Sequence, residues 1–528
     1  MHNNIWKPFV LTLLIIAALL ALFYIPRFNL FGHQMRRVNL LSDVQRVGQD
    51  GRVLAEVYAD SLEGFVEQQL DSSAIKVKHV AYIDSVPEGM IAIEDFGGAQ
   101  AGNSEASTDV RIMDHFYAAL SETGNRLVRI AYFGDSYIEG DILTAYLRDK
   151  LQAVFGGCGV GFVDIDSETA GFRTTIGAKA KGWIAHNAND EHKKDFKAEL
   201  QGINGRYYIP TATATLELKC IPGKLGPRLA KAEVATVYYT AGSGLQLMAA
   251  VNDEELQSLV SASGTPTISE EVRTVHGMHI DTVYTVKPDS QHPLGEYTLD
   301  TTYTEQDIVV STGEQEQGNI AHQSLHGDIR RFRLSVTSGQ SSRFYGVALD
   351  GKTGIAVDNF SMRAANGWKL LDIPEATLRA FDRQRPYDLI VLQYGLNVAN
   401  NKQVDYNWYV RRMKQAIEHI KQAFPRAGIL LVSVADRDER GSDGQWHTMR
   451  GIRELVQFQR KLAADTHVAF WNLYEAMGGD GSLAAMVSEH QANLDYTHIN
   501  FQGGKHLASI LFDVLINGKE NYDRRISQ

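Results

Sequence analysis

Cysteine and clustered positive charge are scarce in this sequence. Its 528 residues include two cysteines, Cys158 and Cys220, which are too few for a disulfide framework. They could form one bridge in an oxidising compartment or lie apart as small buried side chains. The 52 basic residues are outnumbered by 63 acidic ones, which gives a net charge of −11, and they form no long run. A surface that follows a phosphate backbone needs such a run, so we expect no nucleic-acid partner.

Recognisable metal-binding patterns are also missing from the sequence. Two histidine pairs, His276 with His279 and His490 with His498, could by themselves suggest metal ligation. They are not accompanied by Cys, His or Asp residues at the spacing of a known zinc site. We therefore expect no metal ion and no other cofactor.

A long apolar run lies near the N-terminus. Every residue from Phe9 to Ile25 is apolar or Tyr except Thr12, and this length is at the lower edge of a membrane-spanning helix. We interpret residues 1–35 as an uncleaved signal anchor with a transmembrane helix, and a cleaved signal peptide followed by secretion is the alternative. Either interpretation places most of the chain outside the cytoplasm, in the periplasm of the cell envelope or beyond it.

Hydrophobic patterns divide the remaining sequence into four parts. Residues 36–109 form an extension that ends in the Gly-, Ala- and Ser-rich stretch 97–108, which is typical of a linker. Residues 110–170 and 346–528 alternate short apolar runs with amphipathic segments, which predicts one α/β domain with a parallel sheet covered on both faces. Residues 171–345 lack helical periodicity and predict a β-sandwich inserted into that domain. Its aromatic side chains could stack on sugars, as in a carbohydrate-binding module, although most should pack its core.

Polar motifs follow two of the predicted strands of the α/β domain. Gly134-Asp135-Ser136 comes after the apolar run 127–133, and Gly395-Leu396-Asn397 comes after the run 388–394. Ligands of parallel sheets bind at the carboxyl ends of the strands, so we expect Ser136 and Asn397 on one rim. A serine at a tight strand-to-helix turn is exposed beside free N–H groups that can stabilise an oxyanion. Each motif alone is equally typical of a turn or a helix cap.

The segment Asp495-Tyr496-Thr497-His498 offers a base for such a serine. A nucleophilic serine needs a general base, and that base needs a carboxylate to fix its tautomer. An aspartate three residues before a histidine, on a loop that enters a helix, can supply both groups from one segment. Without the serine motif, the same residues would be typical of an exposed polar loop.

In this order and context, the three motifs resemble those of the GDSL/SGNH hydrolase family. The resemblance implies a flavodoxin-like three-layer α/β/α domain with Ser136 as the nucleophile, His498 as the general base and Asp495 as the acid that orients it. The oxyanion hole would be formed by the Ser136 backbone, the Asn397 amide and a donor from the motif that follows the second strand. Two residues are candidates for that donor, namely Ala364 and Gly367.

Within this family, the anchor and the β-rich insert are most similar to extracytoplasmic carbohydrate or peptidoglycan O-acetylesterases. The resemblance implies a serine esterase that removes acyl groups, chiefly acetyl, from an envelope polysaccharide or peptidoglycan. Its substrate would be an acylated glycan, and a membrane acyltransferase is a candidate partner. Two alternatives remain open, an O-acyltransferase that uses the same three residues and a non-catalytic glycan-binding surface protein.

Overall fold

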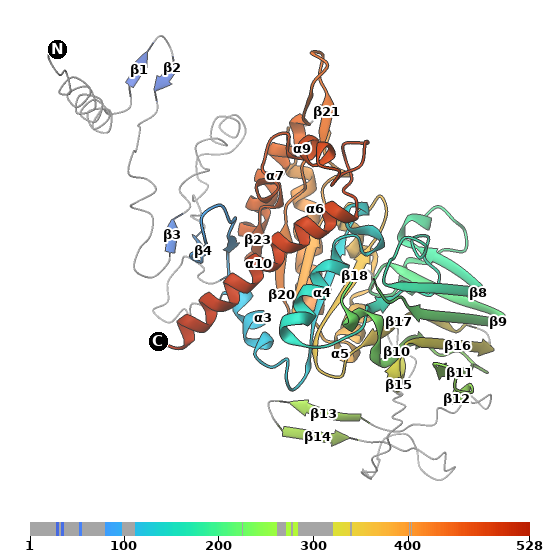
Figure 1. Cartoon of the computed structure of the whole chain (residues 1–528). Coiled ribbons are helices and arrows are strands. Elements are labelled where there is room, and N and C mark those ends of the chain that lie inside the picture. Colours follow the sequence, from blue (N-terminus) through green and yellow to red (C-terminus); the bar gives the residue numbers. More distant parts are fainter. Residues whose placement is uncertain are drawn as a thin grey trace. The chain divides into compact units, whose positions relative to one another are not determined.

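The computed structural model divides the chain into two compact units, residues 1–83 and 84–528 (Figure 1). It describes residues 80–97, 111–223, 225–260, 320–337, 341–400, 402 and 404–528, and the strand segments 28–30, 33–35, 52–54, 271–275 and 278–282. The apolar run Phe9–Ile25 of the predicted anchor and, apart from Gly97, the predicted linker lie outside the described residues. Within the described ranges, no helix is both long enough and apolar enough to cross a bilayer.

The first unit contains two short antiparallel strand pairs. Strand β1 (Phe28–Leu30) pairs with β2 (His33–Met35), and β3 (Arg52–Leu54) pairs with β4 (Val80–Ile83). Each of these strands has three or four residues.

The second unit contains the predicted parallel sheet. Five parallel strands form it, in the spatial order β18 (Gly354–Ser361), β6 (Leu127–Gly134), β19 (Leu389–Gln393), β20 (Gly428–Val432) and β23 (Ala469–Trp471). In sequence order the arrangement is 2-1-3-4-5, as in flavodoxin. All residues of β19 and β20 are buried, because helices cover both faces of the sheet.

Helices pack in two groups around this sheet, and the resulting α/β/α fold has three layers (Figure 1). One group contains α3 (Ile112–Leu120), α4 (Thr144–Phe155) and α10 (Phe501–Ile526). The other contains α5 (Glu375–Gln384), α6 (Asn407–Ala423) and α7 (Arg450–Thr466). Two shorter helices, α8 (Leu473–Ala476) and α9 (Ser482–Ser488), follow the last parallel strand.

Two features of this domain differ from the sequence prediction. An antiparallel strand, β5 (Ile93–Asp95), pairs with the edge strand β23. Helix α10 also continues well beyond the last apolar residues that suggested it. Its final turns are polar and are held by ion pairs from Arg525 to Asp84 and Asp114, which hydrophobic periodicity cannot predict.

The stretch between β6 and β18 forms a β-rich block. Nine of its strands belong to one hydrogen-bonded sheet, namely β7 (Gly161–Val163), β8 (Ile176–Asn187), β9 (Arg206–Cys220), β10 (Ala232–Thr240), β11 (Gln246–Val251), β12 (Gln257–Val260), β15 (Ala321–Ile329), β16 (Arg331–Thr337) and β17 (Arg343–Asp350). A separate hairpin joins β13 (Glu271–Val275) to β14 (Met278–Thr282). Because the nine strands are connected into one sheet, the two-layered sandwich stays a prediction. Strand β7 lies in the stretch expected to be α/β, yet it pairs with β17.

The two cysteines are free and buried in the described structure. Burial raises the pKa of the Cys158 thiol to about 12 and that of Cys220 to about 11. Neither thiol therefore forms a reactive thiolate at neutral pH, and both act as small packing groups.

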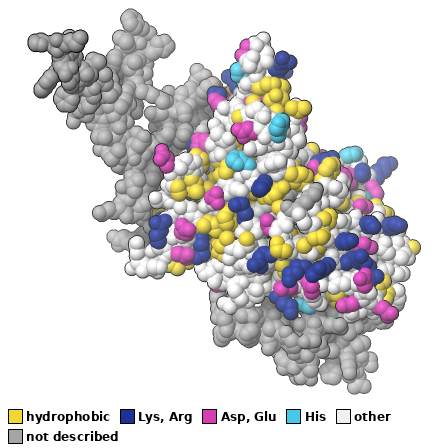
Figure 2. All heavy atoms as spheres, viewed as in Figure 1, with side chains coloured by type: hydrophobic (Ala, Val, Ile, Leu, Met, Phe, Trp, Pro, Cys, Tyr) yellow, Lys and Arg dark blue, Asp and Glu magenta, His cyan; other side chains and the backbone are white. Residues whose placement is uncertain are grey.

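The surface of the second unit carries a mixture of side chains. Figure 2 shows acidic, basic and hydrophobic residues interspersed over the face in view. This mixture matches the modest excess of acidic over basic residues in the whole sequence.

Candidate active site

Ser136 lies at a tight turn directly after β6. A Cβ atom at Gly134 would lie 2.8 Å from the Ile138 side chain and 3.0 Å from the Gln393 carbonyl oxygen, so only glycine fits there. Ser136 then starts a 3₁₀ helix, η1 (Ser136–Asp141). The sequence pattern predicted a helix with Asp141 in its first turn, but Gly140 and Asp141 have positive φ angles and α4 begins only at Thr144.

The structure brings the three predicted residues Ser136, His498 and Asp495 together. The Ser136 Oγ atom lies 3.0 Å from His498 Nε2, and His498 Nδ1 lies 2.8 Å from Asp495 Oδ2. Ser136 comes from the carboxyl end of β6, while the other two lie on the loop before α10. These contacts have the geometry that a serine nucleophile, its base and the orienting acid require.

Asp495 is held in its ionised form by the loop that carries it. Burial raises the pKa of its carboxyl, but hydrogen bonds from the backbone and side chain of His498 and the backbone of Thr497 outweigh this effect, so the net pKa is lowered. The two backbone N–H groups each donate to Oδ1 at 3.0 Å. One carboxylate oxygen therefore fixes the loop, and the other remains for the imidazole.

Asp135 is a buried carboxyl next to the nucleophile whose role the sequence did not indicate. It accepts a hydrogen bond from the Tyr137 N–H at 3.0 Å, and backbone N–H groups of Gly395 and Leu396 also bond to it. Burial raises its pKa to about 6, against the lowering effect of these donors. Asp135 thereby fastens the serine turn to the loop after β19.

Two backbone N–H groups near Ser136 Oγ are available as oxyanion donors. Ser136 and Ala364 line the same pocket, and neither N–H has a hydrogen-bond acceptor among the described residues. Ala364 has a φ of 54°, a left-handed conformation that favours glycine. Of the two candidates from the second motif, Ala364 is thus the one at the pocket.

The other two predicted oxyanion residues, Asn397 and Gly367, are held by other contacts. Asn397 is exposed, and its side-chain amide donates to the Ala365 carbonyl oxygen at 2.8 Å. One amide hydrogen of Asn397 is occupied by this bond, and the other remains. Gly367 precedes a 3₁₀ helix, η5 (Trp368–Asp372), and packs against the Met413 side chain away from the pocket.

The pocket around Ser136 has a volume of about 490 Å³ and a mixed lining. Apolar side chains contribute much of it, namely Ile142, Phe172, Ile499 and Phe501. Polar side chains contribute the rest, and among them Arg363 Nε lies 2.7 Å from Glu139 Oε2. Sequence reasoning missed Glu139, Arg363 and Phe172. The first two could have been suspected because they adjoin the serine motif and Ala364, but nothing in the local sequence singles out Phe172.

A metal site was not expected from the sequence. Within the described ranges, no three His, Cys, Asp or Glu side chains lie close enough together to hold a metal ion. His276 lies outside the described residues, as does the side chain of His279. His490 belongs to the loop before α10, where its carbonyl oxygen accepts a bond from the Asn500 amide.

Comparison with known proteins gives one family and one shared fold. Residues 332–504 match the model of the GDSL-like Lipase/Acylhydrolase family. This range contains Ala364, Asn397, Asp495 and His498, whereas Ser136 lies outside it because the β-rich block separates the first motif from the others. No curated protein matches the sequence.

A solved structure of a peptidoglycan O-acetylesterase has the same fold as this chain. The two sequences are 17% identical, the similarity covers 81% of this chain and 99% of the other, and the TM-score is 0.56. A family two carbohydrate esterase from Cellvibrio japonicus is 8% identical over 65% of this chain and 99% of its own, but its TM-score of 0.21 is too low to support an argument.

Proposed function

We propose that the protein is a serine esterase of the GDSL-like lipase/acylhydrolase family, whose model matches residues 332–504. Its reaction removes acyl groups, chiefly acetyl, from an envelope polysaccharide or peptidoglycan through an acyl-serine intermediate. The observation that carries this proposal is the position of His498, whose two ring nitrogens lie 3.0 Å from Ser136 Oγ and 2.8 Å from Asp495 Oδ2.

In the acylation step, His498 Nε2 takes the proton of Ser136 Oγ while the oxygen attacks the ester carbonyl carbon. Asp495 accepts the Nδ1–H hydrogen bond and stabilises the imidazolium that forms. The backbone N–H groups of Ser136 and Ala364, with the remaining amide hydrogen of Asn397, stabilise the negative carbonyl oxygen. The bond to the alcohol oxygen then breaks, and His498 gives its proton to the leaving alcohol.

In the second step, water replaces the alcohol. His498 takes a proton from the water, whose oxygen attacks the acyl-serine carbonyl carbon. Collapse of this intermediate breaks the bond to Ser136 Oγ, returns the proton to the serine and releases the carboxylic acid. The same three side chains thus serve both steps.

Two observations support a glycan substrate in the cell envelope. The fold shared with the peptidoglycan O-acetylesterase extends over the β-rich block as well as the α/β domain, because it covers 81% of the chain. The apolar run from Phe9 to Ile25 supports a membrane-anchored protein with a periplasmic catalytic domain, or a protein released there after cleavage.

The nucleophile is tested by Ser136→Ala. We expect hydrolysis of p-nitrophenyl acetate to fall by about a thousandfold or more, because the acyl-enzyme cannot form. Labelling by a fluorophosphonate should be lost as well, while the circular dichroism spectrum stays unchanged. Ser488→Ala removes an exposed hydroxyl on α9 and serves as the matched control. Full esterase activity in the Ser136 variant would refute the proposal.

The glycan part of the proposal is tested separately with O-acetylated peptidoglycan. The wild-type protein should release acetate from it, and the Ser136 variant should not. If wild-type protein cleaved p-nitrophenyl acetate but released no acetate from the glycan, the esterase activity would be supported and the glycan substrate would be contradicted. Acetyl groups recovered on an added glycan acceptor would instead favour an O-acyltransferase.

A further inference from the structure

Phe172 is an exposed aromatic side chain in the wall of the Ser136 pocket. It is 59% exposed, whereas Trp408 and Trp446, two other exposed aromatic residues, do not line that pocket. Phe172 lies on the segment that connects β7 to β8, so the β-rich block and not the α/β domain supplies it. An apolar side chain in the wall of a pocket that contains a nucleophile can contact the ligand that fills the pocket.

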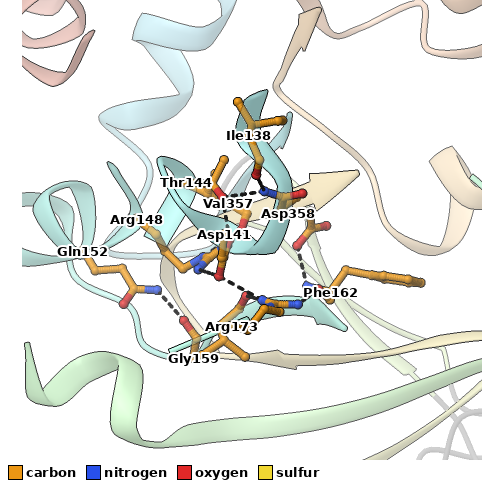
Figure 3. A network of polar contacts seen from close by, with 12 residues as sticks. Ile138, Asp141, Thr144, Arg148, Gln152, Gly159, Phe162, Arg173, Val357 and Asp358 are labelled. Atoms are coloured by element: carbon orange, nitrogen blue, oxygen red, sulfur yellow. Dashed lines mark hydrogen bonds and ion pairs between the residues drawn. The ribbon is translucent and has the colours of Figure 1, made fainter. Parts of the chain in front are cut away.

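The segment that carries Phe172 is fixed in place by its neighbour Arg173. The Arg173 guanidinium donates to Asp141 Oδ2 at 3.0 Å, to the Phe162 carbonyl oxygen at 3.2 Å and to the Val160 carbonyl oxygen at 3.3 Å. Figure 3 shows Arg173 and Arg148 meeting at Asp141, which ends the 3₁₀ helix begun by Ser136. The Arg173 side chain therefore links the segment that carries Phe172 to the end of η1.

Local contacts also hold Phe172 in position. Its backbone N–H donates to the Thr169 carbonyl oxygen at 2.9 Å. A Cβ atom added to Gly140 would lie 3.0 Å from the Phe172 Cβ atom, so the phenylalanine sits directly against the backbone of η1. The backbone of Phe172 is therefore positioned before the ligand arrives, which lowers the entropy cost of binding.

The size of the exposed ring decides which part of an ester could cover it. An acetyl group has two carbon atoms and cannot cover an aromatic ring that is more than half exposed. The alcohol part of a glycan ester is a pyranose ring, which has a flat face of C–H groups and hydroxyls around its edge. The pocket offers a matching surface, because its lining combines the apolar ring of Phe172 with the polar side chains of Glu139, Arg363 and Asn493.

We propose that Phe172 stacks against the pyranose ring that carries the ester, so that the β-rich block forms part of the substrate site. This inference rests on the proposed function and adds to it a specificity residue from outside the α/β domain. In this arrangement the phenyl ring of Phe172 contacts the alcohol part of the ester, and the other pocket walls contact the acyl part.

The test compares three esters with full-length wild-type protein and Phe172→Ala. The esters are 6-O-acetylated chitotetraose, ethyl acetate and ethyl butyrate, none of which has an aromatic ring that could stack artificially. The KM for the saccharide should rise about tenfold in the variant because the stacking surface is lost, with kcat little changed. Both ethyl esters should be cleaved within about twofold of the wild-type rate.

Two further variants make the comparison specific. Phe172→Trp keeps an aromatic face and should retain the wild-type KM for the saccharide. Ile184→Ala removes another exposed apolar side chain of the β-rich block, on β8, and should change none of the three rates. Thermal denaturation of each variant checks that the fold is intact.

Each other outcome contradicts the inference. An equal loss on all three esters would mean that Phe172 supports the nucleophile turn, and a selective loss on ethyl butyrate would assign it to the acyl group. Wild-type protein that fails on the saccharide while Ser136-dependent cleavage of ethyl acetate persists would reject the glycan substrate itself. The wild-type measurement is made before any Phe172 variant is compared. A failure of the glycan proposal is therefore distinguishable from a failure of the Phe172 inference.

Discussion

At the scale of single residues, two opposing effects act on the pKa of the Asp135 carboxyl. Its carboxyl is 2% exposed and lies between the serine turn and the loop after β19, where it accepts backbone N–H groups from both. Burial nevertheless raises its pKa to about 6, because the charged form loses more hydration than the donors replace. The same carboxylate that aligns two motifs of the site therefore costs stability when it is ionised.

This balance predicts how the stability of the protein depends on pH. A folded-state pKa of about 6 lies above the ordinary value of 3.8, so the folded protein binds more protons than the unfolded chain between these values. Stability contributed by protonated Asp135 should be present below pH 4 and be lost as the pH rises through 6. The resulting change in the free energy of unfolding across this pH range is about 3 kcal/mol.

Asp135→Asn tests this prediction, because an amide does not titrate. Relative to the wild type, the melting temperature of the variant should rise between pH 4 and pH 6 and then stay constant to pH 8. Asp328→Asn, at an exposed position on β15, should show no such trend and serves as the control. A difference between Asp135→Asn and wild type that is flat across the whole range would contradict a raised pKa at Asp135.

At the scale of elements, a small hairpin supports the loop that carries Asp495 and His498. Strands β21 (Asp438–Arg440) and β22 (Trp446–Thr448) form it. The Trp446 ring stacks on Tyr496 with a centroid distance of 3.4 Å and an angle of 9°, and the Asp438 N–H donates to the Tyr496 carbonyl oxygen at 3.1 Å. Tyr496 has a φ of 51°, which an L-residue rarely adopts without such support.

We expect Trp446→Ala to lower kcat for ethyl acetate about tenfold, because a small displacement of His498 misaligns the proton transfer. KM should change little, since Trp446 does not line the pocket. Trp446→Phe should restore most of the rate by keeping an aromatic ring on Tyr496. Trp408→Ala, at a similarly exposed tryptophan on α6, is the control. A rise in KM with unchanged kcat would instead assign Trp446 to substrate binding.

The sequence predicted the elements that carry a strong local signal. The predominantly apolar stretches 127–133, 388–394 and 428–434 predicted β6, β19 and β20, because strands covered on both faces have few polar positions. The hairpin, β5 and β7 have three-residue strands, too short for any periodicity to appear. The repeat of Leu143, Leu147, Leu151 and Val154 predicted a helix here, which corresponds to α4. The three leucines are buried, whereas Val154 is 59% exposed.

The residues of the candidate site also fall into those that a local motif predicted and those that it did not. Ser136, Asp495 and His498 stand in short motifs next to predicted strands or helices, so their types and spacing were informative. Ala364 was one of two candidates, and only the backbone geometry selects it. Phe172 reaches the pocket from the β-rich block through contacts between residues far apart in sequence, and no local pattern records such contacts.

At the scale of the whole second unit, a buried ionic cluster joins the β-rich block to the α/β domain. Arg385 follows α5, and its guanidinium lies 2.5 Å from Asp350 on β17 and 2.6 Å from Asp358 on β18. Tyr387 Oη and the Phe162 N–H donate to Asp358 as well, at 2.6 and 2.8 Å. Burial would lower the pKa of Arg385, but the two carboxylates raise it well above its usual value, so the side chain stays charged.

Because one guanidinium compensates the negative charge of both carboxylates, Arg385→Met should destabilise the unit strongly. Removing one partner of a buried ion pair costs about 3–5 kcal/mol, since the remaining charges stay buried without compensation. Urea denaturation of the variant should show this decrease in the free energy of unfolding. Arg379→Met on α5 breaks an exposed ion pair with Glu375 and should cost less than about 1 kcal/mol.

Arg385→Lys distinguishes the charge from the geometry of the cluster. Lysine keeps the positive charge but cannot make paired bonds to Asp350 and Asp358 together, so its stability should lie between those of the wild type and Arg385→Met. It also remains measurable if the methionine variant fails to fold. If Arg385→Lys and Arg379→Met had the same small effect, the cluster would not be what holds the β-rich block, and with it Phe172, against the α/β domain.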